Sequence, residues 1–246
     1  MKKTFTASVL INVIFLLLSL TFIYKKGGID YIKGFFFDFR DSNALVSDHH
    51  VNRLSIFEQS IFTQAGGIVF LGDSLTNNVS WGDFFEGKTF NRGIGGDTTA
   101  AVLNRVDEVV KLKPKIVFLL VGVNDIQSGV SINETVNNYR MIIESLTKND
   151  IKVVAQGILP VNHVKYEKHI IAKFRGVIEP DVAKVENLNA AISKISSEFN
   201  GVSYLPLDAL LDIDGQINDD FTIDGIHLNG KGVRKWVEIL TPIANK

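Results

Sequence analysis

Residues 67–74 read Gly-Ile-Val-Phe-Leu-Gly-Asp-Ser, a short apolar run followed by glycine, aspartate and serine. A continuous apolar run of this length is typical of a parallel strand that is covered on both faces. Similar runs occur at 116–121 and 151–156, and weaker ones occur at 89–91 and 202–205. The sequence therefore predicts a parallel sheet of five strands.

Amphipathic segments separate these runs. Apolar residues recur at helical spacing in 98–111 and 181–199, and a last helix is expected after Asn229. Ser131 and Glu134 have the spacing of a capping box, which predicts the start of another helix. Strands that alternate with helices indicate βαβ units and a doubly wound α/β sheet. Ligands of such sheets bind beyond the carboxyl ends of the strands. Here that rule indicates the loops that start at Gly72, Arg92, Gly122 and Gly157.

The composition excludes several kinds of site. The 246 residues carry 26 basic and 27 acidic side chains, so no global positive field favours nucleic acid, and we expect no nucleic-acid partner. The chain has no cysteine, which excludes disulfides, thiolate nucleophiles and cysteine-ligated metals. The histidines at 49–50, 163 and 169 lack the spacing of metal ligands, and we expect no metal site.

The N-terminus has the pattern of a membrane or export segment. Two lysines precede a mostly apolar run at 7–24, and Lys25 and Lys26 end it. At ~1.5 Å per residue, a helix of this run is about 27 Å long, close to the ~30 Å hydrocarbon core of a bilayer. We therefore predict a transmembrane signal anchor at 1–26, with the main domain outside the cytoplasm. The alternative is a signal peptide whose cleavage releases a secreted protein.

Two further segments have open interpretations. Residues 27–60 are expected to connect the anchor to a main domain at 61–246. The five aromatic residues within 31–39 fit either a membrane interface or an arm that packs on the domain. Residues 158–180 follow the fourth predicted strand and fit either a substrate-facing lid or ordinary surface structure.

The first strand ends in Gly72-Asp73-Ser74, which fits a nucleophile on a tight strand-to-helix turn. This is not the G-x-S-x-G elbow of α/β-hydrolases, because position 76 is threonine. Taken alone, Gly-Asp-Ser is more often a turn with an N-capping serine.

Two other strand ends offer hydrogen-bond donors. The loop Arg92-Gly-Ile-Gly-Gly-Asp-Thr98 fails the dinucleotide pattern at 98, but a glycine N–H there could donate to an oxyanion. Asn124 follows the strand at 116–121 and could supply an amide donor. A plain glycine turn and an Asn-Asp turn are the alternatives.

Near the C-terminus, Asp224 and His227 have an Asp-x-x-His spacing, so one short loop can present both groups. The carboxylate can orient the imidazole, whose other nitrogen can accept a serine proton. A packing role for this histidine before a helix start is the alternative.

Together these four blocks resemble the GDSL/SGNH hydrolase superfamily over about residues 67–243. The stretch Asn-Arg-Gly-Ile-Gly-Gly-Asp-Thr-Thr at 91–99 is similar to the branch of platelet-activating-factor acetylhydrolase catalytic subunits and bacterial relatives. The resemblance implies a flavodoxin-like three-layer α/β/α sandwich. It also implies a site built from the nucleophile Ser74, the triad members Asp224 and His227, and the oxyanion donors Gly96, Asn124 and the Ser74 amide.

The resemblance implies a serine esterase that needs no cofactor. Its substrate would be an acetyl or short-chain ester of a carbohydrate or lipid, cleaved through an acyl-enzyme. An O-acetyltransferase that acts on a glycan and an inactive glycan-binding module are the rival interpretations. The sequence leaves the oligomeric state and the natural substrate open.

Overall fold

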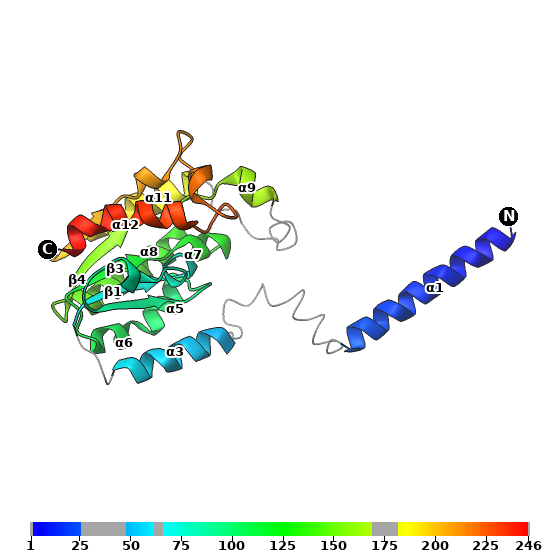
Figure 1. Ribbon diagram of the computed structural model, residues 1–246, viewed down its shortest axis with the longest axis horizontal. Coiled ribbons are helices and arrows are strands. Elements are labelled where there is room, and N and C mark those ends of the chain that lie inside the picture. Colours follow the sequence, from blue (N-terminus) through cyan, green and yellow to red (C-terminus); the bar gives the residue numbers. More distant parts are fainter. Residues whose placement is uncertain (1, 26–47, 62–65, 169–181, 246) are drawn as a thin grey trace. The chain divides into compact units, whose positions relative to one another are not determined.

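The computed structural model of the protein describes residues 2–25, 48–61, 66–168 and 182–245 (Figure 1). The chain divides into two compact units, Met1–Val46 and Ser47–Lys246. The first contains helix α1 (Lys2–Lys25). The second begins with helix α3 (Asp48–Ile61), which falls in the segment predicted as a connecting arm.

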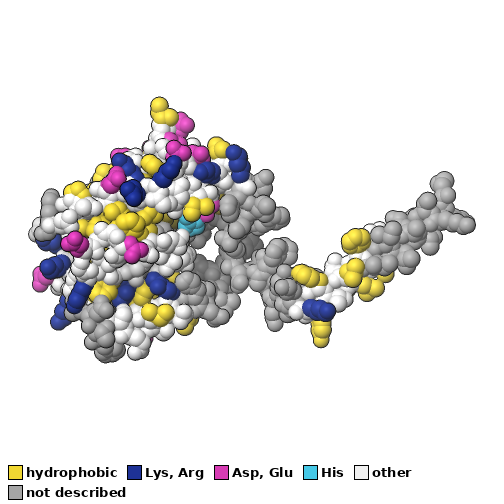
Figure 2. All heavy atoms as spheres, in the orientation of Figure 1, with side chains coloured by type: hydrophobic (Ala, Val, Ile, Leu, Met, Phe, Trp, Pro, Cys, Tyr) yellow, Lys and Arg dark blue, Asp and Glu magenta, His cyan; other side chains and the backbone are white. Residues whose placement is uncertain are grey.

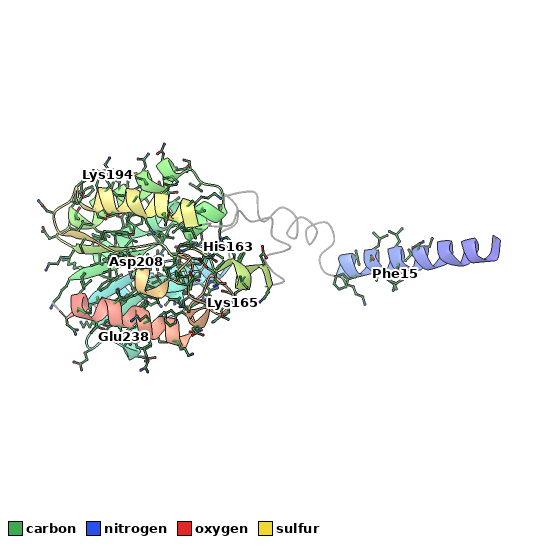
Figure 3. All side chains as sticks on the ribbon, turned by 90° about the horizontal axis from the view of Figure 1, so that it is seen from above. Phe15, His163, Lys165, Lys194, Asp208 and Glu238 are labelled. Atoms are coloured by element: carbon green, nitrogen blue, oxygen red, sulfur yellow. The ribbon has the colours of Figure 1, made fainter. Side chains whose placement is uncertain are left out.

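Helix α1 exposes its described apolar side chains, among them Phe15 and Leu18 (Figure 2; Phe15 is labelled in Figure 3). In the part of the chain that the structure describes, no helix has both the length and the apolar character needed to cross a membrane. The structure therefore does not support the transmembrane helix predicted for residues 1–26. The aromatic cluster at 31–39 lies outside the described residues.

The second unit is built on a parallel five-stranded sheet with the strand order β2-β1-β3-β4-β5. Each predicted strand overlaps an observed one, so the predicted sheet is confirmed. The strands are β1 (Ile68–Gly72), β2 (Thr89–Gly93), β3 (Ile116–Leu120), β4 (Lys152–Gln156) and β5 (Val202–Leu205).

Helices cover both faces of the sheet, which is why the central strands β1 and β3 carry no polar side chain. Figure 3 shows α11, marked by Lys194, and α12, marked by Glu238, on opposite sides of the sheet. This is the expected three-layer α/β/α arrangement. The long helices are α8 (Ile132–Thr147), α11 (Val182–Ser196) and α12 (Gly230–Ala244), and the shorter ones are α4 (Ser74–Asn77), α5 (Thr99–Asn104), α6 (Val106–Lys111), α7 (Val123–Gln127) and α9 (His163–Lys168).

Stacked aromatic rings fix α12 against the sheet. The rings of Phe70 and Trp81 are parallel with centroids 3.8 Å apart, and Trp236 meets Trp81 edge-on at 4.9 Å. The Trp236 Nε1–H donates to Gln156 Oε1 at 2.7 Å, so its polar edge is also satisfied. This packing fixes the middle of α12 beside the sheet.

Two helix predictions can be compared in detail. The Ser131 hydroxyl accepts from the Glu134 N–H at 3.2 Å, as the capping pattern predicts. The single helix predicted over 98–111 is wrong, because α5 and α6 are separated at Arg105 (φ −121°, ψ 7°). At this break the buried Arg105 side chain binds Asp97 and the carbonyl oxygens of Gly72 and Arg92 at the strand ends.

Candidate active site

Ser74 is the first residue of α4, directly beyond the end of β1. The turn is tight because a Cβ at Gly72 would lie 2.1 Å from the Leu120 carbonyl oxygen, a distance that only glycine tolerates. Asp73 caps the helix, and its Oδ1 accepts from the Leu75 N–H at 3.0 Å. The strand end and the cap thus present the Ser74 hydroxyl at the carboxyl edge of the sheet.

Three predicted residues form a continuous hydrogen-bonded chain. The Ser74 Oγ lies 3.0 Å from Nε2 of His227, and Nδ1 of His227 lies 2.7 Å from Oδ2 of Asp224. These groups come from opposite ends of the domain sequence, since 153 positions separate the serine from the histidine. The geometry is the one needed for an imidazole to accept a serine proton while a carboxylate orients the ring.

The carboxylate and the imidazole shift each other's ionisation. Burial raises the pKa of Asp224, but the hydrogen bonds from the His227 side chain, the His227 N–H and the Ile226 N–H outweigh burial and hold that pKa below its ordinary value. The hydrogen bond to Asp224 in turn raises the pKa of His227 above its ordinary value, against the opposing effect of burial. The pair therefore favours an ionised carboxylate and an imidazole that is more basic than an ordinary histidine.

We call residues 222–228 the base loop. Thr222 closes this loop, because its Oγ1 donates to the His227 carbonyl oxygen and accepts from the Gly225 N–H, both at 2.9 Å. Gly225 has φ +93°, and a Cβ there would lie 2.6 Å from the Asn162 carbonyl oxygen. Both the left-handed backbone and the close approach require glycine at this position.

The start of the segment predicted at 158–180 as a lid or as surface packs against the base loop. The Asn162 N–H donates to the Gly225 carbonyl oxygen at 2.8 Å, and the Lys165 ammonium donates to the Thr222 carbonyl oxygen at 2.9 Å. Figure 3 shows Lys165 and His163 on α9. Residues up to 168 thus support the base loop, whereas 169–180 lie outside the described residues.

We call residues 93–97 the glycine loop. It lies beside the serine, since a Cβ on Gly95 would be 3.8 Å from the Ser74 Cβ. Gly96 has φ +85°, and a Cβ there would meet no atom within 4 Å, so its conformation rather than crowding favours glycine.

Asn124 stands in α7, beyond the end of β3, and one N–H of its amide donates to the Asp97 carbonyl oxygen at 2.9 Å. An asparagine amide carries two N–H donors, and this bond occupies one of them. The second can serve a developing oxyanion. The bond also joins the two predicted oxyanion elements, Asn124 and the glycine loop, to each other.

Buried charges behind the glycine loop were not predicted. Asp97 is 2% exposed, and its Oδ2 accepts from Arg105 Nε at 2.8 Å. Arg105 also donates to the carbonyl oxygens of Gly72 and Arg92, at 3.1 and 2.8 Å. A second buried carboxylate, Asp125, accepts from the Thr99 backbone and hydroxyl. One sequence feature could have indicated a buried charge here: Arg105 interrupts an apolar helical stripe, between the buried Val102 and Val106.

None of these groups forms a metal site. Within 2–25, 48–61, 66–168 and 182–245, no group of three His, Asp or Glu side chains is arranged to hold a metal ion. The described side chains of the site offer a hydroxyl, a base and a hydrogen-bond donor.

The sequence model of the GDSL-like Lipase/Acylhydrolase family matches residues 70–235, about two thirds of the chain. The chain belongs to this family. Its description places the protein among carboxylic ester hydrolases, and the resemblance inferred from the four blocks is confirmed. The match includes both loops and all the predicted site residues but ends short of α1 and α3 on the N-terminal side.

Solved structures of the GDSL type share the fold. A protein of Streptococcus pneumoniae named for platelet activating factor is 27% identical, with a TM-score of 0.71 over 80% of this chain and 92% of that one. A GDSL-like lipase from Bacteroides thetaiotaomicron is 22% identical, with a TM-score of 0.66 over 78% of this chain and 97% of that one. The second likeness shows the fold alone.

Curated relatives carry a different name. An N-acylneuraminate cytidylyltransferase from Streptococcus agalactiae serotype III is 25% identical over 167 residues, which are 68% of this chain. The chain spans only 36% of the length of that relative. The name of the longer protein therefore does not define the activity of the shared part.

Proposed function

We propose that this GDSL-family protein hydrolyses acetyl or short-chain acyl esters of a carbohydrate or lipid through an acyl-enzyme on Ser74. The observation that carries the proposal is the 3.0 Å approach of the Ser74 hydroxyl to His227, together with the 2.7 Å contact of His227 with Asp224. An imidazole of raised pKa beside a partly buried serine hydroxyl is an arrangement that activates an alcohol as a nucleophile.

In the first step, Ser74 Oγ attacks the ester carbonyl carbon while His227 Nε2 takes its proton. The C–O bond to the leaving alcohol then breaks, and His227 returns the proton to that alcohol. In the second step, water gives a proton to His227 and attacks the acyl carbon. The acid leaves, and the proton returns to Ser74. Asp224 stays ionised throughout and stabilises the imidazolium, which agrees with its lowered pKa.

The carbonyl oxygen becomes an anion in both steps. We propose that it binds the N–H groups of Ser74 and Gly96 and the second amide N–H of Asn124. Such preorganised donors are worth most in a partly buried site, and loss of one costs ~10²–10³ in rate. The bond from Asn124 to the Asp97 carbonyl supports this role, because it restrains the amide without using both of its donors.

The names of the relatives suggest which esters to compare. The family is described by lipase and acylhydrolase activity, one solved relative is named for platelet activating factor, and a curated relative is named for N-acylneuraminate. We therefore propose a panel of an acetylated N-acylneuraminate, an acetylated neutral sugar and a short-chain phospholipid ester. Product analysis with and without a free sugar acceptor separates hydrolysis from acyl transfer.

The proposal is tested with the full chain and p-nitrophenyl acetate and butyrate. We expect Ser74→Ala and His227→Ala each to lower kcat by about 10⁴-fold or more. Ser80→Ala, at an exposed serine whose side chain makes no cap bond, is the matched control and should keep wild-type activity. A fluorophosphonate should label the wild type and not Ser74→Ala. Equal hydrolysis by all four proteins would remove the assignment.

The prediction of an extracytoplasmic domain remains a proposal. It is supported by the apolar sequence at 7–24 that follows two lysines. A reporter fused to the C-terminus of the full chain should be active outside the cytoplasm, and a cytoplasmic signal would contradict it.

A further inference from the structure

Helix α3 lies before the region that the family shares, yet two of its side chains contact the glycine loop. His50 Nδ1 lies 3.0 Å from Asp97 Oδ1, and Arg53 Nη2 donates to the Gly93 carbonyl oxygen at 3.2 Å. The two contacts lie at the two ends of the loop that presents Gly96. A segment outside the shared domain therefore holds part of the proposed oxyanion pocket.

The helix is firmly seated. Phe57 is 2% exposed, and the guanidinium carbons of Arg53 and Arg92 lie 4.6 and 4.4 Å from the centroid of its ring. Arg92 also donates to the Ser60 hydroxyl at 2.7 Å. Burial of a phenylalanine and two cation–π contacts fix the position of α3 on the domain, so that His50 reaches Asp97 in a defined geometry.

Asp97 connects this helix to the reacting atoms. Its carboxylate binds Arg105 on one oxygen and His50 on the other, at 2.8 and 3.0 Å. Its backbone carbonyl accepts the Asn124 amide, and its backbone follows Gly96 directly. A rotation of Asp97 would therefore move both proposed oxyanion donors, the Gly96 N–H and the Asn124 amide.

We infer that His50 is a positioning residue for the oxyanion pocket, and that α3 is a built-in support of the active site and not a passive linker. This inference rests on the proposed function, since it assigns His50 to the same reaction. His50 does not touch the substrate. It fixes the second oxygen of the Asp97 carboxylate, so that the glycine loop and Asn124 keep the geometry that an oxyanion requires.

The physical argument is preorganisation. Burial raises the pKa of Asp97, whereas Arg105 and His50 favour its ionised form. Without His50, Arg105 still binds Oδ2, but Oδ1 loses this partner in a site that is almost closed to water. Donors that must reorient during the reaction stabilise a transition state less than donors already in place.

The test compares His50→Ala, His50→Gln and the control Gln59→Ala, which changes an exposed residue of the same helix. We expect His50→Ala to lower kcat about three- to tenfold at nearly constant KM, less than the ~10²–10³ that loss of an oxyanion donor costs. His50→Gln keeps an N–H donor and should recover part of the rate. Fluorophosphonate titration corrects every rate for the fraction of folded, active protein.

A double-mutant cycle locates the effect. If His50 acts through the oxyanion donors, His50→Ala should lower kcat by a smaller factor in the Asn124→Ala background than in the wild type. The reason is that the oxyanion pocket of Asn124→Ala is already incomplete. Wild-type kcat in His50→Ala after titration, or full additivity with Asn124→Ala, would overturn the inference. The proposed function would still stand if Ser74→Ala is inactive. If Ser74→Ala is as active as the wild type, the proposed function itself fails.

Discussion

The base loop is held mainly by bonds within itself, whereas the glycine loop is held by side chains that lie outside it. In the base loop, Thr222 and Asp224 accept hydrogen bonds from N–H groups two or three positions away. The glycine loop depends on Arg105, eight positions from Asp97, and on Asn124, 27 positions away. One half of the site is therefore a local motif, and the other half is a product of the tertiary fold.

This difference predicts different responses to mutation. A change in the base loop should alter the chemistry and leave the domain folded, because its bonds span few residues. A change behind the glycine loop should alter both stability and activity, because the same buried charges join several strand ends.

Among the tests that compare the two loops, the largest effect is expected from Asp224→Asn, which changes the base loop. The amide oxygen can still accept from the His227 and Ile226 N–H groups, so the loop should keep its shape. An amide no longer stabilises the imidazolium and permits the wrong tautomer, and we expect kcat to fall about 10³–10⁴-fold. The measurement is p-nitrophenyl acetate hydrolysis beside urea unfolding. A large loss of stability with little loss of kcat would contradict the local description of this loop.

The second-largest effect is expected from Arg105→Met, which tests the buried side chains that hold the glycine loop. Methionine keeps much of the volume but leaves Asp97 without its arginine and removes one donor from each of the Gly72 and Arg92 carbonyl oxygens. Loss of one partner of a buried ion pair typically costs about 3–5 kcal/mol of unfolding free energy. We expect a loss of this order in urea unfolding, together with a lower kcat in the protein that remains folded.

Arg140→Ala is the matched control for that experiment. Arg140 pairs with Glu198 at 2.7 Å, a slightly shorter contact than that of Arg105 with Asp97, but both partners are largely open to solvent. Surface ion pairs contribute little to the free energy of unfolding, so the urea midpoint of Arg140→Ala should stay near that of the wild type. If the two arginine variants lose equal stability, burial of the Arg105 pair is not what holds the glycine loop.

The same contrast explains what could be predicted from the sequence. Strands of continuous apolar residues, the Gly-Asp-Ser turn and the Asp-x-x-His spacing are local patterns, and the observed strands and base loop contain them. The pairing of Asp97 with Arg105 and His50 has no local pattern, because it depends on which strand ends and helices become neighbours after folding. Arg105 could be recognised as a charge on an apolar face, but its partners and the helix break at this residue could not be predicted.

The smallest effect concerns the pH dependence, and it tests whether anything outside the base loop tunes its base. The hydrogen bond to Asp224 raises the pKa of His227, and the charge of Asp73 adds to this increase. Because the reaction needs the neutral imidazole, kcat/KM should rise with pH through a midpoint above the ordinary histidine value of ~6.5. Burial raises the pKa of Asp73 itself to about 7, so its charge is present only in the upper part of that range.

Asp73→Asn keeps an oxygen for the Leu75 N–H and removes the charge, so the midpoint should move to lower pH by a fraction of a unit. Asp107→Asn, at an exposed position in α6, should leave it unchanged. The profiles are measured with p-nitrophenyl acetate from about pH 5 to about pH 9, a range that spans ordinary histidine ionisation. A wild-type midpoint at or below the ordinary value would contradict the raised pKa. An unmoved midpoint in Asp73→Asn would mean that groups within the base loop alone determine the pKa of His227. The two loops would then differ even more in how far they depend on residues outside themselves.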